Sequence, residues 1–97
     1  MHEHYKIKEA IWPLLEEAGF NVESENSQVD YYGSLRTIFV KNEKRVLLEW
    51  DGEEGFGYAE VWKNNEWEKL PTNVLESKES ELQAAIEMLC VDLRGYL

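Results

Sequence analysis

Few residues of this chain have the types and spacing that catalysis requires. The two histidines, His2 and His4, stand at the N-terminus. Two imidazoles on a fraying tail fall short of the three or four ligands of a zinc site. The single cysteine, Cys90, lies beside an apolar helical pattern with no histidine near it in the sequence. A buried, unreactive thiol is the simpler interpretation. We therefore predict no catalytic residue and no metal ligand set.

The acidic segment Asp51–Gly55 matches a cation-binding loop only in part. Gly55 stands where the fifth-position oxygen ligand of an EF-hand belongs, and Phe56 where the glycine of that loop belongs. The sequence also has no phosphate-binding glycine loop and no nucleophile elbow. It therefore predicts that the chain is not an enzyme and uses no cofactor.

A different chemistry is offered around Trp50–Trp67, where aromatic and acidic side chains are interleaved. Tryptophan and tyrosine give large, rigid contact areas, and carboxylates beside them select a positively charged partner. We predict a partner-binding surface made of Glu49, Asp51, Glu53, Glu54, Tyr58, Glu60, Trp62 and Trp67. Two alternatives stay open: these aromatics only pack across strands, or they form the seam of a homodimer.

Composition limits the partner and the compartment. Ten Lys and Arg against twenty Asp and Glu give a net charge of −10, which repels nucleic acid and anionic membranes and attracts basic proteins. Excess acid also serves solubility alone. No apolar run is long enough to span a membrane, and one cysteine cannot form an internal disulfide. We expect a cytoplasmic protein, a single domain over residues 1–97, with a basic protein as partner.

Hydrophobic periodicity predicts the elements that position these residues. Apolar residues at spacings of three and four predict a helix over Ile7–Ala18, kinked at Pro13, and another over Leu82–Tyr96. Alternating segments separated by turns predict an antiparallel meander of five or six strands between them. The fold class is therefore α+β, with both helices on one face of the sheet.

The predicted turns assign a register to each strand pair. They fall at Glu25-Asn26, Gly33-Ser34, Asn42–Lys44, Asp51–Gly55 and Asn64-Asn65. The facing pairs are Val22 with Val29, Val29 with Ile38, Val40 with Val46, Leu48 with Ala59, and Trp62 with Trp67. Because the strand period is two, these registers define one buried face. It contains Val22, Val29, Ile38, Val40, Val46, Leu48, Trp50, Ala59 and Val61.

The same registers turn the strand residues of the candidate surface toward the other face. The predicted neighbours there are Glu49 with Tyr58, Leu47 with Glu60, Arg45 with Trp62, and Glu60 with Lys69. Arg45 on Trp62 would be a cation–π contact, and Glu60 with Lys69 an ion pair.

In size, acidity and element order, with aromatics and acids on one face, the chain is similar to the immunity proteins of bacterial toxin systems. The resemblance implies a cognate toxin, often a basic nuclease, whose substrate groove a rigid acidic surface blocks. One alternative is a homo-oligomeric structural or small-molecule-binding domain with the open sheet face as its seam. Another is an acidic mimic of nucleic acid. Ala84, Met88 and Val91 lie beside the main stripe of the last helix, which could therefore pack against another copy.

Overall fold

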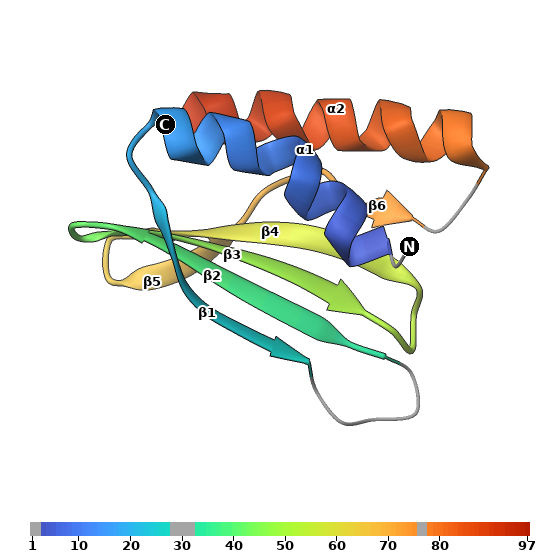
Figure 1. The fold of residues 1–97 in the computed structure, drawn as a ribbon, viewed down its shortest axis with the longest axis horizontal. Helices are drawn as coiled ribbons and strands as arrows, with labels where there is room; N and C mark the ends of the chain where they lie inside the picture. Colours follow the sequence, from blue (N-terminus) through green and yellow to red (C-terminus); the bar gives the residue numbers. More distant parts are fainter. Residues whose placement is uncertain (1–2, 28–32, 76–77) are drawn as a thin grey trace.

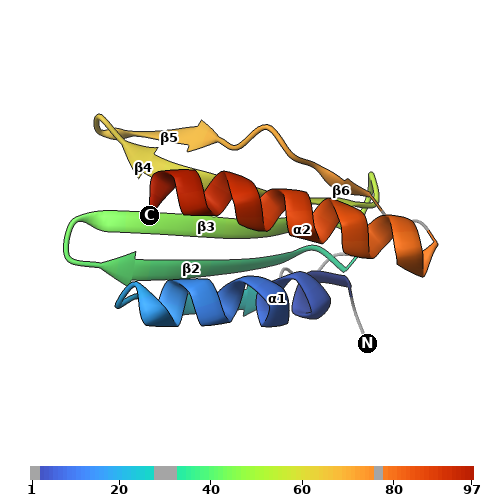
Figure 2. The same ribbon diagram turned by 90° about the horizontal axis from the view of Figure 1, so that it is seen from above.

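The computed structural model describes residues 3–27, 33–75 and 78–97. The elements are α1 (Glu3–Glu17), β1 (Asn21–Ser27), β2 (Leu35–Lys41), β3 (Lys44–Asp51), β4 (Phe56–Lys63), β5 (Glu66–Lys69), β6 (Val74–Leu75) and α2 (Glu79–Tyr96). The strands form one antiparallel sheet in the order β1-β2-β3-β4-β5, and β6 also pairs with β4. Both helices cover the same face of this sheet (Figures 1 and 2). The predicted α+β class and the placement of the helices are confirmed.

Helix α1 ends because Gly19 adopts a left-handed conformation. Its φ of 96° suits a residue without a Cβ. The amide of Phe20 then donates to the carbonyl of Leu15, 2.9 Å away, and the amide of Gly19 donates to the carbonyl of Glu16. This pattern satisfies carbonyls that the helix end leaves open and turns the chain down into β1.

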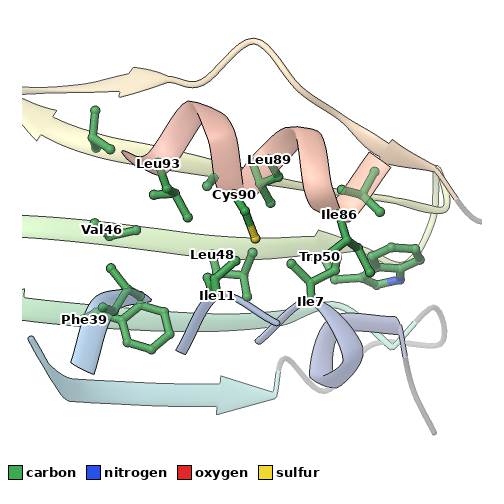
Figure 3. Packing of buried hydrophobic residues seen from close by; sticks show 14 of the residues in the cluster. Ile7, Ile11, Phe39, Val46, Leu48, Trp50, Ile86, Leu89, Cys90 and Leu93 are labelled. Atoms are coloured by element: carbon green, nitrogen blue, oxygen red, sulfur yellow. The ribbon is translucent and has the colours of Figure 1, made fainter. Parts of the chain in front are cut away.

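One apolar core joins the helices to the sheet. Figure 3 shows Phe39, Val46, Leu48 and Trp50 of the sheet with Ile7 and Ile11 of α1 and Ile86, Leu89, Cys90 and Leu93 of α2. The stripe at spacings of three and four in each helix supplies the helical half of the core, as the periodicity predicts. The predicted burial of Val46, Leu48, Trp50, Ala59 and Val61 is confirmed.

The predicted register of β2 is wrong by one residue. Lys41 pairs with Lys44 across a two-residue turn in which Asn42 has a φ of 53°, so Phe39, not Val40, faces Val46. A shift of one residue exchanges the two faces of a strand. The buried side chains of β2 are therefore Leu35, Thr37 and Phe39, and the predicted burial of Ile38 and Val40 is wrong.

The predicted hairpin at Glu25-Asn26 is also wrong. Residues 21–27 form one strand, which pairs with β2 through a bulge between Val22 and Ser24. Val22 lies at this edge and is 43% exposed, so its predicted burial is wrong. The register predicted for Gly33-Ser34 is wrong as well, because Ser27 faces Leu35. Val29 lies outside the described residues.

His4 is not on a frayed tail. It lies in α1, is fully buried, and has its Nε2 2.9 Å from Oγ1 of Thr37 on β2. The Thr37 hydroxyl donates to the carboxylate of Glu25 at 3.5 Å, and Glu25 pairs with Lys8 at 2.8 Å. This chain of polar contacts ties α1 to β1 and β2. His2 lies outside the described residues.

Cys90 occupies the boundary between α2 and the core, as predicted. Its side chain is 9% exposed, and its Sγ lies 3.9 Å from the carbonyl oxygen of Ala10 on α1. Burial raises the pKa of the thiol, Glu87 raises it further, and Arg94 opposes them.

We expect a thiol reagent at pH 8 to modify Cys90 in the folded chain at least ~10-fold more slowly than in the unfolded chain. Equal rates in buffer and in urea would contradict this placement.

Candidate functional site

The sheet face turned away from the helices, called the open face below, carries the candidate residues that lie on strands. Its side chains come from the strand positions that alternate with the buried ones. On β2 to β5 they are Arg36, Ile38, Val40, Arg45, Leu47, Glu49, Asp51, Phe56, Tyr58, Glu60, Trp62, Trp67 and Lys69, and β1 adds Asn21, Ser24 and Asn26. Leu47 is only 5% exposed although no helix covers it, because its neighbours on this face shield it.

A row of polar and aromatic contacts crosses the middle of the open face. Nη2 of Arg36 on β2 donates to Oε1 of Glu49 on β3 at 2.9 Å, and the hydroxyl of Tyr58 on β4 donates to the other carboxylate oxygen. The ammonium of Lys69 on β5 lies 4.7 Å from the centre of the Tyr58 ring and 5.4 Å from that of Phe56. The predicted facing of Glu49 and Tyr58 is confirmed, and Glu49 is held from two sides.

Glu60 faces both Leu47 and Lys69, as the register predicts. The predicted ion pair is nevertheless not formed, because the ammonium of Lys69 lies over the two aromatic rings. In the described part of the chain, the carboxylate of Glu60 has no ion-pair partner. It is therefore available to a cation from outside.

The hydroxyl of Tyr58 is kept protonated by its surroundings. Burial raises the pKa of this group most, and the hydrogen bond and negative charge of Glu49 raise it further. A raised pKa in the folded state adds stability below the unfolded value of about 10, and that stability is lost as pH rises above it.

We expect Tyr58→Phe to lower the free energy of unfolding by about 0.5–1.5 kcal/mol at pH 7. Urea unfolding across pH should show the difference between the variant and the wild type shrinking above pH ~10. A constant difference would contradict the bond.

A tryptophan pair lies on the open face beside the β4–β5 turn. Trp62 and Trp67 face each other, as predicted, with ring centres 5.3 Å apart at 72°. The turn residues Asn64 and Asn65 have φ of 54° and 63°, the left-handed values of a type I′ hairpin. The hydroxyl of Tyr96 in α2 donates to the backbone oxygen of Trp62 at 2.9 Å, so the helix anchors this hairpin.

The predicted contact of Arg45 with Trp62 is replaced by an ion pair. Nε of Arg45 lies 3.3 Å from the carboxylate of Glu23 on β1. Arg45 and Trp62 line the same hollow, of about 550 Å³, which they share with Asn42, Glu43, Asn64 and Asn65. Trp62 of the tryptophan pair therefore borders a polar depression between two hairpin turns.

The loop between β3 and β4 presents two carboxylates at the opposite end of the sheet. Oδ1 of Asp51 accepts from the amides of Glu53 and Glu54 at 3.0 and 3.1 Å, and Ser34 accepts from the amide of Gly52. Asp51 therefore shapes the loop with its own side chain, as Asp does in tight turns. The side chains of Glu53 and Glu54 are exposed and carry no ion pair in the described ranges.

Charge is divided between the two ends of the molecule. The N-terminal ends of both helices lie at the same end as the β3–β4 loop, and both hairpin turns lie at the other (Figures 1 and 2). The loop end, called the acidic end below, carries Glu3, Asp51, Glu53, Glu54, Glu79 and Glu81, with Lys6 and Lys78. The turn end carries Lys41, Lys44, Arg45, Lys63 and Arg94 among Glu16, Glu17, Glu23, Glu43 and Glu66. Among the described residues, the turn end is therefore close to neutral, and the excess of acid lies at the loop end and along the middle of the molecule.

The eight predicted residues fall into three groups along this axis. Asp51, Glu53 and Glu54 lie at the acidic end, Glu49, Tyr58 and Glu60 in the middle, and Trp62 and Trp67 beside the turn end. The eight residues leave out Arg36, Phe56 and Lys69, which hold the central row, although the predicted register places Lys69 on this face. The correct register of β2 would have placed Arg36 beside Glu49. Within residues 3–27, 33–75 and 78–97, no three His, Cys, Asp or Glu side chains are grouped to hold a metal ion.

Comparison with known proteins gives no match to a protein-family model, a curated protein or a solved structure. Among the described residues, no helix is long and apolar enough to cross a membrane.

Proposed function

We propose that the chain is a non-catalytic, acidic protein-binding module whose open face and acidic end bind a basic protein. Its role is that of an immunity or inhibitor protein, and the partner is a toxin that it neutralises in the cytoplasm. The observation that carries the proposal is the open face itself. On it, aromatic side chains and the carboxylate of Glu60, which forms no ion pair in the described part of the chain, are held on strands with no helix above them, and the adjoining loop adds Glu53 and Glu54.

The carboxylates of this surface have two different roles in binding. Glu49 and Asp51 are held by contacts within the chain, so they position their neighbours. Glu53, Glu54 and Glu60 form no ion pair in the described part of the chain and can pair with Lys or Arg of a partner. The exposed area of the aromatic rings would be desolvated in the complex and slow its dissociation.

The polarity of the charge would orient the encounter. A basic partner is attracted to the acidic end first, and the field accelerates association at low salt. A basic nuclease holds cations where phosphates bind, so carboxylates at matching positions would occupy that groove. Strand residues already fixed by cross-strand contacts lose little conformational entropy on binding.

Affinity capture from cells that naturally contain the chain tests this proposal. The wild type and the triple variant E53K/E54K/E60K serve as baits, with E16K/E17K/E43K at the turn end as a control with the same change in charge. We expect the wild type and the control to retain one basic protein that the first variant loses. Equal retention of the basic protein by both triple variants would contradict the proposed binding surface. A wild type that captures only itself through the open face would favour the homo-oligomeric alternative.

A further inference from the structure

The outer face of α2 carries an apolar strip that the monomer leaves uncovered. Among the described residues, the most exposed large apolar side chains are Leu75 at 58%, Val91 at 57% and Met88 at 56%. Met88 and Val91 lie on α2, and Ala84 and Gly95 continue their line at spacings of four, three and four. That spacing keeps residues on one helical face, here the face directly opposite the buried stripe. Figures 1 and 2 show none of the described helices or strands on this side of α2.

Gly95 in this strip is not required by close packing within the monomer. It lies inside α2 with an ordinary helical φ, and a Cβ placed on it would meet nothing within 4 Å. Gly95 lies in the last turn of α2, and without a side chain it would let the backbone of a second helix approach closely at this point.

The strip also has complementary charge along one flank. Glu87 and Arg94 lie seven residues apart, which is two helical turns, on the same side of the strip. Glu79 and Glu81 occupy the first turn of α2 and Arg94 the last. In an antiparallel pair of α2 helices, Glu87 of each copy can therefore approach Arg94 of the partner subunit.

We propose that a second copy of the chain packs on this strip, α2 against α2, antiparallel about a two-fold axis between Leu89 and Cys90. That axis sets Met88 against Val91 of the partner subunit. It also sets Ala84 against Gly95 of the partner subunit. One register therefore places the large pair at the centre and the small pairs at the ends. The same axis brings Glu87 near Arg94 of the partner subunit, twice by symmetry.

Two opposing terms determine the strength of this dimer. Each copy carries a net charge of −10, which opposes association, but the antiparallel arrangement keeps the two acidic ends apart and sets each beside the nearly neutral turn end of the other copy. A seam of one helix face is smaller than a standard interface, so we expect a weak dimer with a Kd on the order of 10–100 µM. Salt screens the net repulsion between the two copies and should therefore strengthen the dimer. The open face points away from the seam, so partner binding there is independent.

Sedimentation equilibrium up to ~1 mM protein at low and at ~0.5 M salt tests the seam. We expect the wild type to dimerise, more so in salt, and M88K/V91K to remain monomeric. Val22→Lys is the matched control, an exposed apolar residue on β1, and should dimerise as the wild type does. Circular dichroism verifies that each variant is folded. A monomeric wild type under all conditions, or a dimer that M88K/V91K leaves intact, would overturn the proposal.

A charge exchange tests the register. E87R alone and R94E alone should each weaken the dimer by ~10-fold or more, and the double variant E87R/R94E should restore it. Failure of the double variant to recover would overturn the antiparallel pairing. M88K/V91K should still capture the basic partner, so the seam and the proposed function fail separately.

Discussion

Phe39→Ala is expected to destabilise the domain by about 3–5 kcal/mol, because it removes a fully buried aromatic ring from the core. The ring stacks on Trp12 of α1 with centres 5.9 Å apart, and it faces Val46 in the sheet. A loss of this size is a large share of the ~5–15 kcal/mol that holds a domain of this length together. Urea unfolding followed by tryptophan fluorescence measures it, and Phe39→Leu provides a milder variant that stays folded.

Ile38→Ala is the matched control, since Ile38 precedes Phe39 in β2 and points to the open face. It is half-buried there, so we expect a cost of about 1 kcal/mol or less. The register predicted from the sequence implies the reverse ranking. If Ile38→Ala proves more damaging than Phe39→Leu and Phe39→Ala, the observed register of β2 is contradicted.

Gly57→Ala is expected to cost about 1–3 kcal/mol, because it overpacks the layer between α1 and the sheet. A Cβ at this position of β4 would lie 2.8 Å from Cδ1 of Ile7 and 2.9 Å from Cε3 of Trp50. Trp50 faces Gly57 across the strands and is 3% exposed, so its ring cannot move into solvent. Chemical denaturation of the two chains gives the difference.

Two further variants make this measurement specific. Ile7→Val removes the methyl group that the new Cβ meets, so G57A in that background should cost less than in the wild type. Gly95→Ala adds the same methyl group to an open position on α2 and should stabilise the monomer by up to about 1 kcal/mol. Equal effects of G57A and G95A would contradict the close packing around Gly57.

The registers of β3, β4 and β5 could be predicted because the residue types in the turns between these strands indicate where each turn lies. Asn64-Asn65 and the glycines of Asp51–Gly55 favour left-handed conformations, so the position and length of each connection follow from the sequence. In β2, Ile38, Phe39 and Val40 are all apolar, and alternation cannot select a face. Only the length of the turn between β2 and β3 determines which side chains of β2 face the core, and a difference of one residue in that length exchanges the two faces of the strand.

The structure of β1 and the burial of His4 could not be predicted from the sequence for a different reason. β1 is polar at nearly every position, and contacts from another element fix it, such as the pairing of Glu25 with Lys8 of α1. His4 similarly owes its burial to Thr37, which is distant in sequence. The division of charge between the two ends also depends on which termini and turns meet in space. Composition alone gives the total of −10.

The affinity of the captured partner for the wild type and for E53K/E54K/E60K, measured by calorimetry across a salt series, tests the proposed binding surface most directly. We expect the wild type to lose affinity steadily as salt rises, because its carboxylates pair with cations of the partner. The triple variant should bind at least ~10-fold more weakly at low salt, with a shallower dependence on salt. The control E16K/E17K/E43K should retain most of the affinity and the slope. If the triple variant matches the wild type in both affinity and salt dependence, the open face and the acidic end are not the binding surface.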